Sequence, residues 1–416
     1  MLLPLMFILM PRPDISGSHF FTYPALALIL AAVSIFITNN MNFNKKVINV
    51  ITLFYFLTFI MVLSAVVNWS NISFNTLFHF AKPILFIIVL CFGYVVGTSK
   101  DYPTIVRGML KSAYIILFFQ IVIGLAQLYN ISVFDFIYSD HKARPIGGLI
   151  RVTGTLANPN FFAWIVVQAM VIILLFEKKI AKKYIWLLLG VGLLLISGSR
   201  TFLLLFPLLI FFIKLIYSRK NAVFYFVKMP IYGLLLGFGF YLLYMFILKF
   251  GHNFPYLYQL LNIIETRSLD SIGSFDARLR MWEGALIDFN NSTGLLTWMF
   301  GMGPGTDSVV DNDYFYSMIN YGVLGLFLNL LIYTVIYFQF KKLKIKEFSV
   351  LGRQYIVFSL IVGFQAESLG GWNYPIFILF YAGLAFALFK NQDEIVENIQ
   401  EVVKKKRKRV KIVWSK

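Results

Sequence analysis

Cysteine and histidine, the side chains that most often carry redox or metal chemistry, are scarce in this sequence. The one cysteine, Cys91, lies in an apolar run, so a disulfide within the chain is excluded and we expect a small buried side chain there. The histidines fall in different segments without the spacing of a metal site: His19, His79, His141 and His252. We therefore expect no metal cofactor.

Charged residues are also few. They make up 13% of the 416 residues, whereas hydrophobic residues make up 59% and the mean hydropathy is +0.77. These values lie outside the range of soluble domains and predict a polytopic membrane protein. Acidic residues are the scarcer kind, so the net charge is +18, and the densest cluster of cations lies in the basic tail at 391–416, between Lys404 and Lys411. This placement favours a cytoplasmic membrane anchor over a nucleic-acid partner.

Apolar runs of about 20 residues, the length that crosses a bilayer, recur along the chain. We predict spans at 20–38, 47–67, 74–98, 105–129, 155–176, 184–198, 201–217, 222–248, 314–340, 349–367 and 372–389. The apolar piece at 1–10 is stopped by a proline-rich turn and is interpreted as a broken first span; a signal peptide is disfavoured because no basic region precedes it. The sequence thus predicts an all-α membrane domain at 1–390 with about 11–12 transmembrane helices.

Lysine-rich loops alternate with lysine-poor loops, which predicts the orientation of the spans. Cytoplasmic loops of bacterial-type membrane proteins retain Lys and Arg. The lysine-rich set and the basic tail are therefore predicted to be cytoplasmic. The segments 130–154, 198–200 and 249–313 then lie on the outer side, the last of them as a long extracytoplasmic loop.

Arginine dominates the cations of these outer segments. They are Arg144, Arg151, Arg200, Arg267, Arg278 and Arg280, besides two lysines. The guanidinium group can grip a phosphate with two parallel hydrogen bonds. Surface salt bridges are the favoured interpretation for Arg144 and Arg267, whereas Arg151, Arg200 and Arg278 favour an anion site.

The predicted starts of three spans lie beside these arginines. Asn158 followed by Pro159 is typical of a helix N-cap, Arg200 precedes another span, and Asp311-Asn312 precedes a third. A helix start offers unpaired N–H groups and the positive end of a dipole to an anion. Three such starts predict a phosphate-binding constellation at the outer face.

The outer loop at 249–313 carries two further features. Apolar residues recur every three or four positions and predict an amphipathic helix on an apolar surface: Phe275, Leu279, Trp282, Leu286 and Phe289. The glycine-rich turn at 301–305 could approach a phosphate, but no Gly-Lys-Ser/Thr follows it. A tight turn without a ligand is the favoured interpretation, and no nucleotide cofactor is expected.

Four motifs in order resemble the O-antigen ligase and O-antigen polymerase superfamily over about residues 100–390. They are Arg151-(x2)-Gly154-(x3)-Asn158-Pro159-Asn160, Ser199-Arg200, Arg278-(x15)-Gly294 with Trp282, and Asp311-Asn312-(x9)-Gly322-(x2)-Gly325. The resemblance implies a glycosyltransferase-C-like membrane enzyme acting on undecaprenyl-diphosphate-linked glycans. It places four arginines near the diphosphate: Arg151, Arg200, Arg278 and Arg280. It makes Asn158, Asn160, Trp282, Asn312 and Tyr314 supporting residues, and implies a chain-length regulator and a flippase as pathway partners.

One position departs from the ligases of this superfamily, which carry histidine where this chain has Asp311. Aspartate at a helix start stays ionised and is a weaker base than histidine. The chain therefore resembles a polymerase of O-antigen or capsule repeat units, with the ligase as the near alternative. Asp311 or Asp313 is the expected catalytic base, against the rival interpretation that Asp311 or Asn312 only caps the helix.

A transporter of lipid-linked oligosaccharides is the alternative from another class. Carriers place ionisable residues at mid-membrane and are built from paired repeats. The sequence offers an isolated Lys82, with Lys214 and Lys228 near span edges, and no repeat. The long outer loop favours the enzyme.

Overall fold

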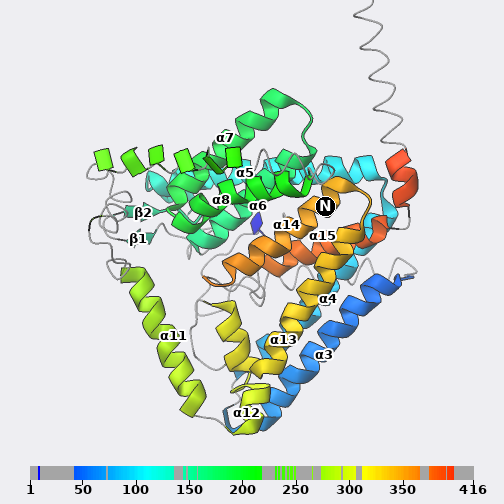
Figure 1. Cartoon of the computed structure of the whole chain (residues 1–416), viewed down its shortest axis with the longest axis vertical. Coiled ribbons are helices and arrows are strands. Elements are labelled where there is room, and N and C mark those ends of the chain that lie inside the picture. The colour runs from blue at the N-terminus through cyan, green and yellow to red at the C-terminus, as the bar shows by residue number, and fades with distance from the viewer. Residues whose placement is uncertain are drawn as a thin grey trace, which may run out of the picture.

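The computed structural model describes the parts of the chain that hold most of the predicted spans. These parts are 8–9, 42–71, 74–134, 144–146, 149–156, 158–217, scattered positions between 230 and 249, 265, 273–291, 294–305, 312–365, 374–389 and 391–397. Within them the chain is helical apart from one short hairpin (Figure 1). Of the described helices, six are long and apolar enough to cross a membrane, as expected of a multi-pass membrane protein.

The helices follow the predicted spans closely. They are α3 (Lys45–Val67), α4 (Phe74–Ser99), α5 (Tyr102–Leu128), α6 (Pro159–Phe176), α7 (Ile180–Ser197), α8 (Arg200–Tyr217), α13 (Asp313–Lys342), α14 (Lys346–Val362) and α15 (Tyr374–Leu388). The helices α3 to α7 and α13 meet the length for a span, whereas the apolar parts of α8 and α15 are shorter. The predicted span 20–38 lies outside the described residues, and of 222–248 only scattered helical positions are described.

One short two-stranded hairpin accompanies the helices, and the described elements otherwise confirm the all-α prediction. The strands β1 (Arg144–Ile146) and β2 (Leu149–Arg151) pair antiparallel, with Arg144 opposite Arg151. Three residues per strand are too few to show the alternating pattern by which a strand is recognised in a sequence. Two more helices lie in the segment predicted as the outer loop, α11 (Gly273–Asn291) and α12 (Leu295–Phe300).

The closest helix pair, α4 and α15, packs through glycines. A Cβ atom at Gly93 would lie 2.1 Å from the carbonyl oxygen of Phe380, and one at Gly383 would lie 2.1 Å from the carbonyl oxygen of Leu90. Gly97, four residues after Gly93, faces Ala387 in the same way. Small residues at this spacing let two backbones approach within a membrane, where packing and not burial from water drives association.

Polar side chains join helices within the bundle core. Gln354 of α14 donates from Nε2 to Oε1 of Gln168 of α6 over 3.0 Å, and both amides are buried. The rings of Trp164 and Tyr374 meet edge to face beside this pair, with centroids 4.6 Å apart. Hydrogen bonds between membrane helices stabilise each pairing by roughly 0.6–2 kcal/mol.

The helix α13 is broken at Gly322, where a single continuous span was predicted. Gly322 has φ 69° and ψ −174°, outside the helical region. The carbonyl groups freed by the break are bonded again: Met302 N donates to Ile319 O over 2.7 Å, and Ser64 Oγ donates to Asn320 O over 2.8 Å. Irregular backbone is tolerated at membrane depth only when its polar groups find such partners.

The helix ends fall into two groups, which we name by their cations. The arginine end comprises the starts of α4, α6, α8, α13 and α15, the ends of α3, α7 and α14, and the β1–β2 hairpin. The lysine end comprises the starts of α3, α5, α7 and α14, the ends of α4, α6, α13 and α15, and residues 391–397. Hydrogen bonds join members within each group, as in Asn44 Nδ2 to Phe386 O over 2.8 Å at the lysine end.

Candidate functional site

Arg151 lies against the end of α7. Its Nε donates to the carbonyl oxygen of Ser197 over 3.3 Å, and the next residue, Val152, donates its N–H to Ile196 O over 3.2 Å. Gly198 then ends α7 in the left-handed conformation, with φ 60°. Because β2 is fixed on a helix end, the half-buried arginine is held at a defined place at the arginine end.

The start of α6 confirms the predicted N-cap. The Asn158 side chain accepts a hydrogen bond from Asn160 N over 2.8 Å, and Pro159 occupies the first helical position. Ser199 Oγ in turn donates to Asn160 Oδ1 over 2.9 Å. This bond ties the α6 start to the α8 start, whose first residue is Arg200, so the backbones of three predicted site residues are brought together.

Two glutamines of α5, which the sequence analysis missed, hold the loop that follows Arg151. Gln127 Oε1 accepts from the N–H groups of Thr153 at 3.0 Å and Gly154 at 2.9 Å. Gln120 accepts from Thr155 N at 3.1 Å and donates to Thr155 Oγ1 at 2.7 Å. The sequence carries one signal for these two residues, an amide side chain inside an apolar run. A buried amide must find hydrogen-bond partners.

The start of α13 confirms Asn312 as the cap. Its side chain accepts from Tyr314 N at 3.0 Å and from Phe315 N at 3.2 Å. Asp313 follows in the first turn, only 1% exposed, and its N–H donates to Gly363 O over 2.8 Å. The Tyr314 hydroxyl donates to Leu360 O, which also ties α13 to the end of α14. The other predicted carboxylate, Asp311, lies outside the described residues.

One more bond joins these two halves of the arginine end. Thr201 Oγ1, in the first turn of α8, donates to Gln365 Oε1 in the turn after α14. That turn also contains Gly363, the acceptor for Asp313 N. The hairpin, the α6 and α8 starts and the α13 start are therefore connected through side-chain and backbone bonds, although they come from distant parts of the sequence.

The helix α11 lies on α13 as its apolar stripe predicts. The rings of Trp282 and Phe315 are 5.7 Å apart, and Phe289, 0% exposed, packs with Ile319. Arg278, also on α11, is half-buried, whereas Arg280 is exposed. Arg278 is thus the better placed of the two to act inside a site.

The glycine turn at 301–305 serves the fold, as the favoured interpretation held. Gly305 N donates to Asn320 Oδ1 over 2.9 Å, and Met302 N is used at the α13 break. Gly301 has φ 81°, and a Cβ there would lie 2.4 Å from the Asn320 carbonyl carbon. The N–H groups of Met302 and Gly305 are therefore engaged by the protein.

A polar group on α4 was also missed. His79 Nδ1 lies 2.9 Å from the Tyr316 hydroxyl of α13, and Lys82, 5% exposed, has its ammonium 5.4 Å from the centre of the Tyr316 ring. Lys82 is the isolated cation of the sequence prediction; the signal for a polar group was its spacing of three from His79 on an apolar helix. Ionisable residues at membrane depth are costly and mark functional sites.

Comparison with known proteins does not assign the chain to a family. A scan against protein-family models finds no match, and a search of curated proteins finds none either. The fold itself defines the class, a multi-pass helical membrane protein.

Proposed function

We propose that this protein is a glycosyltransferase of the bacterial plasma membrane that polymerises undecaprenyl-diphosphate-linked oligosaccharide repeat units of O-antigen or capsule at the outer face. The supporting observation is the arginine end, where the Arg151 strand, the starts of α6 and α8 and the buried Asp313 are joined by hydrogen bonds. The resemblance in sequence supports the substrate class.

The transfer needs no sugar nucleotide. The acceptor hydroxyl oxygen of the incoming lipid-linked unit bonds to the anomeric carbon of the growing glycan. The bond from that carbon to the lipid diphosphate breaks, and the diphosphate leaves with the electron pair. Arginine groups neutralise the charge that develops on the leaving group, the role of Arg151, Arg200, Arg278 and Arg280. A carboxylate, Asp311 or Asp313, takes the hydroxyl proton.

The arginines give the sharpest test of the diphosphate site. Lysine retains the charge but cannot form two parallel bonds to a phosphate. We expect Arg151→Lys, Arg200→Lys and Arg278→Lys to lose polymer while the protein still accumulates in the membrane, with Arg107→Lys, at an exposed position of the lysine end, as the matched control. Polymer of normal length in the first three variants would contradict the proposed binding of the diphosphate by these arginines.

A carrier for lipid-linked oligosaccharides is the second candidate, because of two particular observations. The α13 break at Gly322 and the His79–Lys82 pair facing it are features that transporters use at membrane depth. Surface polysaccharide from a strain lacking this protein separates the candidates on a gel. Single-repeat chains indicate the polymerase, carrier-bound polymer the ligase, and lipid-linked units retained in the cytoplasm the carrier.

A further inference from the structure

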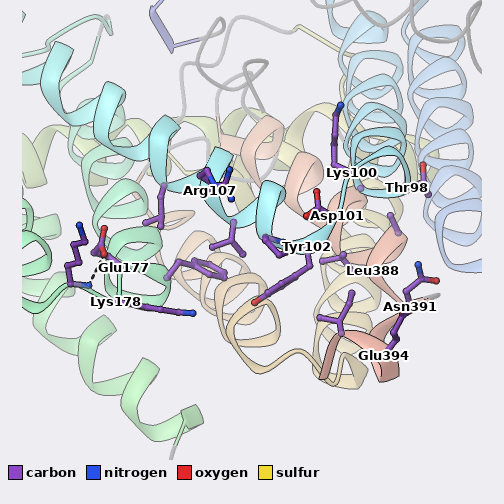
Figure 2. A pocket seen from close by; sticks show the side chains of 18 residues that line it. Thr98, Lys100, Asp101, Tyr102, Arg107, Glu177, Lys178, Leu388, Asn391 and Glu394 are labelled. Carbon is purple, nitrogen blue, oxygen red and sulfur yellow. Dashed lines mark hydrogen bonds between the residues drawn. The ribbon is translucent and has the colours of Figure 1, made fainter. Parts of the chain in front are cut away.

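A cavity of about 860 Å³ lies at the lysine end, between the ends of α4, α6 and α15 and the start of α5 (Figure 2). This volume is within the range of roughly 300–1,000 Å³ that small-molecule sites occupy. The proposed transfer at the arginine end makes no use of it.

The inner walls of the cavity are apolar. Val106 and Leu110 of α5, Phe176 of α6 and Leu388 of α15 line it. Residues 391–397 form a further wall that contributes Ile395, and this segment is fastened to the loop after α13. Lys344 N donates to Gln392 Oε1 over 3.1 Å, and Lys344 Nζ forms a 2.7 Å ion pair with Asp393.

Four cations line the same cavity: Lys100, Arg107, Lys178 and Lys179. All four are exposed, and within the described parts of the chain none forms an ion pair. Figure 2 shows Lys178 beside Glu177 on one side of the cavity and Lys100 above Asp101 on the other side. An apolar interior therefore opens between positive groups.

Two of the three carboxylates that line the cavity are already engaged. A hydrogen bond from Thr104 lowers the pKa of Asp101, and the nearby Arg107 acts in the same direction. Burial raises the pKa of Glu177, but hydrogen bonds from the Tyr114 hydroxyl and from Lys179 N outweigh burial and lower it. The four cations against the three carboxylates leave the lining with one positive charge in excess.

We propose that this cavity binds one anionic phospholipid of the cytoplasmic leaflet. An acyl chain fills the apolar interior, the phosphate lies beside Lys178 and Lys179 at one end of the cavity, and Lys100 adds positive charge at the other end. Basic pockets between membrane helices on the cytoplasmic side bind anionic head groups in this way. Free phosphate makes no use of the apolar walls, and a zwitterionic lipid gains little from the surplus of positive charge.

Native mass spectrometry of the full-length protein in nanodiscs tests the proposal. Discs of phosphatidylcholine with a minor share of phosphatidylglycerol are compared between the wild type and the triple variant Lys100→Gln, Lys178→Gln, Lys179→Gln. We expect a phosphatidylglycerol adduct on the wild type. The triple variant should retain it about 100-fold less, since each interfacial lysine contributes about fivefold. Lys45→Gln, Lys341→Gln, Lys342→Gln removes as many charges from the same end outside the cavity and should retain the adduct.

A cavity-filling variant keeps the test decisive if the triple variant misfolds. Val106→Trp leaves every lysine in place but occupies the space of the acyl chain, so the adduct should also be lost. Three results would overturn the proposal. One is equal loss in the control variant, which means unspecific attraction to the surface. Another is an adduct that survives Val106→Trp, and the third is displacement of the lipid by inorganic phosphate alone.

Discussion

The two ends of the helix bundle use charge in opposite ways. Among the described residues of the arginine end the ionisable groups are held by the protein, as Arg151 is by Ser197 O and Asp313 is by burial. At the lysine end they are numerous and exposed, as Lys100 and Lys178 are. A fixed guanidinium suits chemistry, because preorganised groups need no rearrangement when charge develops. Exposed lysines suit orientation in the membrane and contact with lipid head groups.

The backbone differs between the ends as well. The arginine end contains the hairpin, the left-handed turn at Gly198 and, one half-helix deeper, the break at Gly322. The described lysine end consists of helix ends joined by short links. Irregular backbone in a membrane costs free energy unless its polar groups find partners. Its concentration at one end therefore points to function there.

The prediction with the largest expected effect is that the two ends of the bundle lie on opposite sides of the membrane. Cysteines are introduced by Ser292→Cys and Ser415→Cys in a Cys91→Ser background and treated with an impermeant reagent on whole cells. We expect labelling of the first and none of the second, because the lysine alternation places 249–313 outside and the tail inside. Labelling of the Ser415→Cys variant alone would reverse the two ends and every site assigned to them.

Gly322→Val should unfold the protein or cost roughly 4 kcal/mol or more, because a β-branched residue there meets both strain and a clash. Gly322 has φ 69°, and its Cβ would lie 2.2 Å from Met299 O. Detergent-solubilised yield and thermal midpoint measure the effect. Gly192→Val on α7, where nothing lies within 4 Å, is the control and should change stability by about 0.5 kcal/mol or less. An equal loss of stability in the Gly322→Val and Gly192→Val variants would show that the break at Gly322 does not account for the effect.

Asp313→Asn should slow chain growth about 100-fold, the usual contribution of a positioned base. The rate is measured in membranes with purified lipid-linked repeat units at matched protein levels. Asp311→Asn is the comparison: slow growth in that variant alone moves the base to Asp311. Rates near wild type in both leave the arginines as the main source of catalysis.

Gln354→Leu, midway between the ends, should have the smallest effect, about 1 kcal/mol of stability with activity unchanged. It leaves the buried Gln168 amide without its 3.0 Å partner. The double variant Gln168→Leu, Gln354→Leu should be less destabilised than the sum of the two single variants, since no amide is then left unpaired. Thermal midpoints in one detergent measure all three, and strict additivity would exclude coupling between the two amides.

The sequence by itself determined the class of the protein, the helices of the described spans and the caps of α6 and α13. Composition, apolar run length and the chemistry of Asn158 and Asn312 are local properties, so they can be evaluated without a fold. The stripe on α11 was predictable for the same reason, because helical periodicity is also local.

Only the tertiary structure decided which distant residues meet. The break at Gly322 depends on α12 and on Ser64, and the His79–Lys82 pair becomes meaningful only when α4 faces α13. The β1–β2 hairpin is stabilised on the end of α7, and the lysine-end cavity is formed by four helix ends. Such features arise from contacts between segments far apart in the chain, and no local pattern in the sequence encodes those contacts.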